Sequence, residues 1–116
     1  MEEVTIDLDY ILSKYKIELN ELPKDLVGPV LMKDDFSYLI IEAIAIDNPN
    51  NFKGVMDRGS YIRVVGDKEL TLNKSTLEKL AGREVRFPGE VEVRLSAFAG
   101  RIITTGSYIK WYLEGV

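Results

Sequence analysis

The residues that most often carry enzymatic chemistry are missing from this 116-residue sequence, which contains no cysteine and no histidine. The chain lacks the usual ligands of zinc, copper, haem and iron–sulfur centres, and it has no Ser-His or Cys-His pair for nucleophilic catalysis. Its 19 acidic residues leave a carboxylate-only metal site or an acid–base pair open, although Asp34-Asp35 and Asp47-Asn48 lack calcium-loop spacing. No glycine-rich phosphate loop occurs. The sequence predicts a protein without cofactor or metal that is not an enzyme.

Length and composition are typical of one compact domain, with 46% hydrophobic residues to form a core. No run of about 18 apolar residues is present, and the first residues carry no basic segment of a secretory leader. A cytoplasmic protein without a membrane partner is therefore expected.

The charge is unevenly distributed along the chain. Residues 1–26 hold seven acidic and three basic residues, a net charge of −4, whereas residues 27–116 hold twelve of each. An acidic arm on a neutral body is unlike the basic surfaces that bind nucleic acid, and it is compatible with a protein partner. We expect residues 1–26 to form an acidic arm and residues 27–116 the main domain.

The arm has helical periodicity that ends at Leu22-Pro23. Two interpretations stay open: an extra helix laid on the body, or a segment that becomes ordered only against a partner. The apolar stripe consists of Leu8, Ile11, Leu12, Tyr15, Leu19 and Leu22.

The body alternates strands and helices in a pattern that predicts an α+β fold with antiparallel sheets. The helix from Asp34 or Asp35 to Asn48 is apolar nearly all round, which favours an interface role. Gly66-Asp67 has the composition of a hairpin turn, and Ser75 with Glu78 that of a helix capping box closed by Gly82. The expected strands are 27–32, 52–57, 60–65, 69–73, 91–100 and 108–113, and the second main helix is 75–82.

The strand around Phe98 poses a specific question. If Val91, Val93, Leu95, Ala97 and Ala99 point inward, Phe98 points outward between Ser96 and Gly100, and Gly100 marks a bulge or a close backbone approach that re-aims Arg101. Alternatively, Gly100 is a bend, Phe98 packs under the arm and Arg101 bridges to a carboxylate. Both interpretations stay open.

From Val27 onward, about 90 residues resemble the small effector or coupling proteins of bacterial multicomponent diiron monooxygenases. The phenol hydroxylase and toluene monooxygenase branch is the most similar, and the regulatory component of methane monooxygenase is related. The segments that carry the resemblance are "VGPVL", "IIEAIAIDNP", "DRGSYIRV", "ELTLNKSTLEKLAGR", "EVEVRLSAFAGRI" and "YIKWY".

The resemblance implies two β-α-β-β units, no cofactor, and a regulatory role in aromatic hydrocarbon catabolism. Such a protein binds the large α-type subunit of the diiron hydroxylase and shifts its conformation, which controls substrate and oxygen access and couples electron input to product. The free protein is expected as a monomer. Carried over by motif, the expected partner-binding residues are Asp47, Asn48, Asp57, Arg58, Gly59, Ser60, Tyr61, Ser96, Phe98, Gly100 and Arg101.

Two other classes stay open. A small-ligand sensor would use Arg58, Arg63 or Arg101 as an anion clamp. A single-stranded nucleic-acid binder would stack bases on Tyr61, Phe98 and Tyr108, although the charge distribution argues against a nucleic-acid partner.

Overall fold

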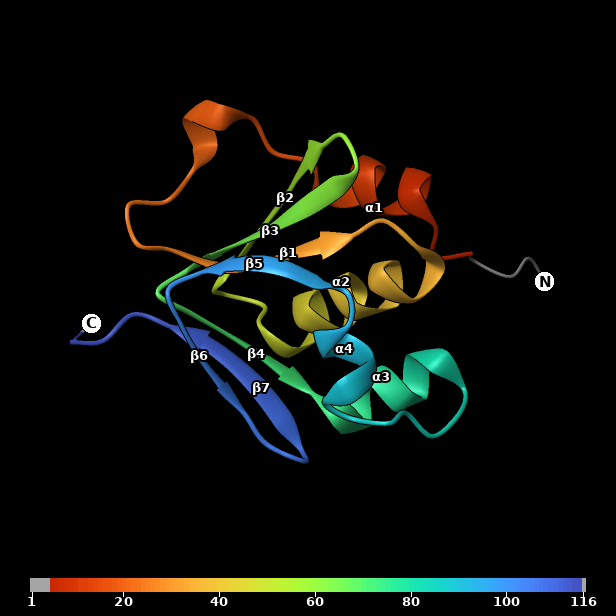
Figure 1. Ribbon diagram of the computed structural model, residues 1–116. Helices are drawn as coiled ribbons and strands as arrows, with labels where there is room; N and C mark the ends of the chain where they lie inside the picture. The colour runs from red at the N-terminus through yellow and green to blue at the C-terminus, as the bar shows by residue number, and fades with distance from the viewer. Residues whose placement is uncertain (1–4, 116) are drawn as a thin grey trace.

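The computed structural model describes residues 5–115, which form two antiparallel sheets packed with helices (Figure 1). The predicted α+β class is confirmed. The first sheet has the order β2-β3-β1-β5, from Phe52–Arg58, Tyr61–Asp67, Leu26–Met32 and Leu95–Ala99. The second has the order β4-β7-β6, from Glu69–Asn73, Tyr108–Tyr112 and Arg101–Thr104. The helices are α1 (Leu8–Tyr15), the short 3-10 turn η1 (Leu19–Glu21), α2 (Asp35–Asp47), α3 (Lys74–Ala81) and α4 (Gly89–Glu92).

The two sheets are connected by strands that bend from one sheet into the other. Lys68, with φ of 75°, lies between β3 and β4, so the hairpin predicted at Gly66-Asp67 is wrong. Both residues belong to β3, and β4 pairs in the other sheet. Gly66 is required for packing instead, because an added Cβ would lie 2.3 Å from Cγ of Leu70. The glycine allows the bend to close onto a core leucine.

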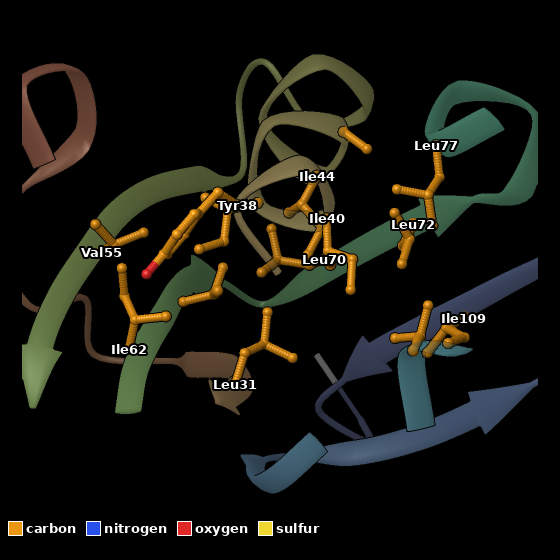
Figure 2. Packing of buried hydrophobic residues seen from close by; sticks show 14 of the residues in the cluster. Leu31, Tyr38, Ile40, Ile44, Val55, Ile62, Leu70, Leu72, Leu77 and Ile109 are labelled. Atoms are coloured by element: carbon orange, nitrogen blue, oxygen red, sulfur yellow. The ribbon is translucent and has the colours of Figure 1, made fainter. Parts of the chain in front are cut away.

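Helix α2 lies at the centre of the core. Asp34 caps its first turn by accepting a 2.8 Å hydrogen bond from the Ser37 backbone N–H, as predicted. Most of its side chains are buried, and the helix packs against α1, α3, β2 and β4. The interface role expected from its all-round apolar character is therefore wrong, because the chain covers the helix on more than one side. Figure 2 shows Ile40 and Ile44 of this helix among core side chains of other elements, such as Leu31, Ile62, Leu72 and Ile109.

The arm forms a helix that is laid on the body, one of the two interpretations left open. Ile11 of α1 is fully buried, and Asp7 caps the helix by accepting from the Tyr10 N–H. The helix is shorter than predicted, because Lys16 pairs with Val55 at the edge of β2 and draws the backbone out of the helix after Tyr15. Leu19, expected on the buried stripe, is 68% exposed.

A buried carboxylate holds α1 against α2. Glu42 of α2 accepts a 2.5 Å hydrogen bond from the Tyr10 hydroxyl and a second one from the Tyr15 hydroxyl. Lys14 donates to the Tyr10 oxygen at 2.9 Å, and its Nζ lies 3.9 Å from Glu42. These three partners from one helix compensate the burial of a charged group. Burial and the hydrogen bond to Glu42 raise the pKa of Tyr15 to about 12.

Residues 74–94 depart from prediction in two ways. The capping box is wrong, because Asn73 is the cap residue of α3 and Glu78 instead accepts a hydrogen bond from the Val85 N–H. Gly82 does close α3, with φ of 69°. The strand predicted from residue 91 starts only at Leu95, since Val91 belongs to α4, and Val93 is 70% exposed rather than inward. The Arg94 side chain, which donates to Asp34 and to the Glu90 carbonyl, fixes this helical turn.

Within residues 5–115, no helix is both long enough and apolar enough to cross a membrane.

Candidate protein-binding surface

The hairpin between β2 and β3 holds five of the predicted contact residues. Asp57 accepts hydrogen bonds from Lys33 Nζ at 2.6 Å and from the Gly59 N–H at 3.0 Å, and these two donors lower the pKa of its carboxyl group. Gly59 has φ of 80°, a conformation that glycine adopts without strain. Asp57 and Gly59 therefore build the turn. Arg58, Ser60 and Tyr61 are exposed and available to a partner.

Three large apolar side chains are exposed at the end of the first sheet, and we call Met32, Tyr61 and Val93 the sheet-end patch. Met32 is the register partner of Tyr61, and its N–H donates to the Arg94 carbonyl at 2.9 Å, next to Val93. Exposed apolar side chains gathered in one place are typical of protein contacts. The sequence analysis missed Met32 and Val93. The exposure of Val93 was missed because the alternation of β5 was extended back into the helical turn of α4.

Ser96 and Phe98 lie on β5, at the edge of the first sheet. Phe98 is 42% exposed, which agrees with the outward orientation and not with packing under the arm, since α1 packs against α2 and β2. The bulge is at Ser96 and not at Gly100: Val30 pairs with Ala97 and Leu31 with Leu95, which leaves Ser96 as the extra residue. Ser96 is also exposed. This bulge, together with the late start of the strand, breaks the predicted inward alternation, and Ala97 is exposed as well.

Gly100 and Arg101 mark the passage from β5 to β6. Gly100 has φ of 90°, and a Cβ there would lie 2.7 Å from the Tyr112 carbonyl oxygen. The glycine is thus both a bend and a close approach of two backbones, which joins the two interpretations. Arg101 is exposed and lies 2.8 Å from Glu114, the carboxylate bridge that one of them expected.

Asp47 and Asn48, the other two predicted contact residues, are directed toward β4. The Asn48 side chain accepts from the Thr71 N–H at 2.9 Å and donates to the Thr71 carbonyl at 2.7 Å. Asp47 accepts from the Asn73 N–H at 2.9 Å and from the Thr76 hydroxyl at 2.7 Å. These bonds tie the end of α2 to the second sheet and to the start of α3. Their geometry gives both residues a structural role.

The residues considered for each of the two alternative sites lie on different strands. Arg58 and Arg63 are in the first sheet, whereas Arg101 is in the second, where it is paired with Glu114. The three side chains considered for base stacking, Tyr61, Phe98 and Tyr108, are likewise divided between non-adjacent strands. Across residues 5–115, no group of three or more acidic side chains is arranged to hold a metal ion.

Several of the predicted residues are exposed and available for contact, and comparison with known proteins agrees with a contact role for the chain. The sequence profile of the MmoB/DmpM family matches residues 25–112. The chain belongs to the MmoB/DmpM family. The resemblance noted in the sequence is thereby confirmed.

The relatives of this MmoB/DmpM protein are regulatory components of monooxygenases rather than catalytic ones. The alkene monooxygenase system effector subunit of Xanthobacter autotrophicus (strain ATCC BAA-1158 / Py2) is 31% identical over 96 residues, which span 83% of this chain and 94% of that protein. A chain of the phenol hydroxylase–regulatory protein complex superposes with a TM-score of 0.68 at 25% identity, covering 77% of this chain and 99% of that one. The soluble methane monooxygenase regulatory protein B superposes with a TM-score of 0.59 at 26% identity, covering 79% of this chain and 67% of that one.

Proposed function

We propose that this chain is the cofactor-free regulatory subunit of a multicomponent hydrocarbon monooxygenase and acts by binding the large α-type subunit of a diiron hydroxylase. The observation that carries the proposal is the family match over residues 25–112, joined to a fold shared with a chain from a phenol hydroxylase–regulatory protein complex. The proposal places the chain in the cytoplasm together with its hydroxylase.

The proposed mechanism is a shift between two hydroxylase conformations. A regulatory protein changes that equilibrium only if it binds one conformation more tightly than the other. A tenfold shift requires about 1.4 kcal/mol of differential binding free energy. We propose that the conformation favoured by the bound chain controls substrate and oxygen access and couples electron input to product formation.

The proposed contact residues are six exposed members of the predicted set that the turn and bend geometry does not require: Arg58, Ser60, Tyr61, Ser96, Phe98 and Arg101. To these we add Met32 and Val93 of the sheet-end patch. Asp47, Asn48, Asp57, Gly59 and Gly100 support this surface through the hydrogen bonds and backbone conformations described above.

The test is to capture the partner with tagged protein from the native cell, measure its iron content, and assay turnover with and without the chain. We expect a stoichiometric iron-containing hydroxylase whose product yield per electron donor consumed rises when the chain is added. An iron-containing partner whose rate and coupling do not respond to the chain would contradict the regulatory role.

A further inference from the structure

The edge strands of the two sheets differ in whether other parts of the chain bond to their backbone. The edge of β2 is closed by the arm, where Lys16 bridges to Val55 and the Ile17 N–H donates to the Val55 carbonyl at 3.0 Å. The edge of β4 is closed by the side chains of Asp47 and Asn48, which bond to the backbone of Thr71 and Asn73. On both edges, the chain itself satisfies backbone groups that would otherwise be open to another strand.

The remaining edge is open. β5 pairs with β1 and β6 pairs with β7, and among the described residues no strand lies on the other side of either. Because Gly100 alone separates them, β5 and β6 form one bent strand that borders both sheets (Figure 1). We call residues 95–104 the open edge. The exposed side chains along it are Ser96, Ala97, Phe98, Arg101, Ile103 and Thr104.

The charge around the open edge indicates which kind of strand it accepts. No acidic residue occurs between Glu92 and Glu114, and the bases in this interval are Arg94, Arg101 and Lys110. Each of these bases faces an acid of another segment: Arg94 pairs with Asp34, Arg101 with Glu114 and Lys110 with Glu69. Only in the Arg101–Glu114 pair are both side chains more than half exposed, at 63% and 70%, so Arg101 is the base that a segment with acidic side chains can recruit.

A second copy of the chain fits this edge poorly when the two copies pair around Ala97. Antiparallel pairing in that register would place Arg94 opposite Gly100 of the second copy and beside its Arg101, at both ends of the contact. Like charges brought together across paired strands are destabilising. In this register, the charge pattern favours a different protein.

We propose that the open edge takes up an extended, acidic segment of the hydroxylase as an added strand. Backbone hydrogen bonds along residues 95–104 supply affinity, and the exposed side chains of Phe98 and Ile103 supply contact area. Arg101 exchanges its exposed partner Glu114 for an acid of the added segment, which costs little because an exposed ion pair contributes little stability. This inference rests on the proposed function and specifies its contact.

Hydrogen–deuterium exchange of the chain, alone and with saturating purified hydroxylase, tests the proposal. Those amides of residues 95–104 that point away from β1 and β7 should exchange quickly in the free chain and at least about tenfold more slowly in the complex. Amides of β2, on the closed edge, should change little. Binding that leaves exchange at residues 95–104 unchanged overturns this proposal alone, whereas a hydroxylase that does not bind at all overturns the proposed function as well.

One pair of variants sharpens the test. Arg101→Glu should raise the dissociation constant about tenfold, whereas Lys53→Glu on β2 should leave it unchanged. Thermal unfolding verifies that each variant is folded.

Equal affinities for Arg101→Glu and Lys53→Glu would overturn the acidic partner. Sedimentation of the chain alone tests whether a second copy pairs with the open edge. A dimer whose formation at higher concentration protects residues 95–104 from exchange would overturn the assignment to the hydroxylase.

Discussion

The two borders of the first sheet differ in whether the chain itself covers them. At β2, residues 5–17 of the same chain cover the border with a helix, a backbone bridge and a buried Tyr–Glu cluster. At β5, the backbone is open and its side chains are small or exposed. The difference teaches that exposure of backbone edges in this protein is local: the chain covers the β2 border with its own N-terminal segment and leaves the β5 border free.

The covering segment lies before the part of the chain that the family shares, because the family match begins at residue 25. We propose that residues 1–26 are an acidic arm whose described part is integral to the fold, and that residues 27–116 form the domain that contacts the hydroxylase. If so, changes in the arm should alter stability, whereas changes on the open edge should alter binding.

The largest loss of stability is expected for Ile11→Ala in the closed region. Ile11 is fully buried between the arm and the body, so truncation leaves a cavity and should lower the free energy of unfolding by about 3–4 kcal/mol. Leu19→Ala on the same arm, at an exposed residue, should cost less than about 0.5 kcal/mol. Urea unfolding measures both. Equal losses would mean that α1 does not pack as described.

Gly54→Ala tests the same border by a change on β2. Gly54 has φ of 142°, and an added Cβ would lie 2.3 Å from the Tyr15 carbonyl oxygen. A loss of about 2–3 kcal/mol is expected, with faster proteolysis of the arm. Gly59→Ala is the control, since Gly59 also has positive φ but nothing lies within 4 Å of its added Cβ; it should cost about 1 kcal/mol. Similar costs at both positions would show that only backbone strain matters.

Tyr15→Phe tests the buried cluster with a smaller change. Loss of the hydrogen bond to Glu42 should lower the free energy of unfolding by about 1–2 kcal/mol at neutral pH. The pKa of Tyr15 is raised to about 12 in the folded chain. The folded state therefore retains this proton when the unfolded state has lost it, above pH about 10. The stabilising contribution is complete below that pH and is lost as the pH rises toward 12.

Unfolding measured across this alkaline range should show a steeper fall for the unmodified chain than for Tyr15→Phe. The pKa of Lys14 is raised mainly by its hydrogen bond to Tyr10 and its attraction to Glu42, and both partners remain in Tyr15→Phe. The comparison therefore reports on the Tyr15 hydroxyl together with its smaller effect on Lys14. Parallel pH profiles would argue against the Tyr15–Glu42 bond.

A small effect on stability is expected at the open border, where the effect on binding should be large. Phe98→Ala should change the free energy of unfolding by less than about 1 kcal/mol, because the side chain is 42% exposed. Its affinity for the hydroxylase should fall about tenfold or more. Titration calorimetry and urea unfolding separate the two quantities. A loss of several kcal/mol in stability would place Phe98 in the core.

The sequence by itself determined the features that depend on near neighbours. Helix α2 begins at its predicted cap, Gly82 ends α3, and most strands lie where alternation and turn residues predict them. Segments such as "DRGSYIRV" led to the family, and the missing cysteine and histidine agreed with a role without chemistry of its own. Such signals are local because caps, turns and alternation are set by hydrogen bonds and side-chain directions within a few residues.

The tertiary structure decided the features that depend on contacts between residues far apart in the sequence. Lys16 leaves its helix to pair with Val55, and Gly66 extends a strand instead of turning because Leu70 packs against it. Asp47 and Asn48 match the family segment, yet their side chains face β4. Local sequence patterns do not show which strand borders are closed. The borders are closed by hydrogen bonds between residues far apart in the sequence, such as those of Ile17 to Val55 and of Asn48 to Thr71. The location of the open edge follows from those contacts alone.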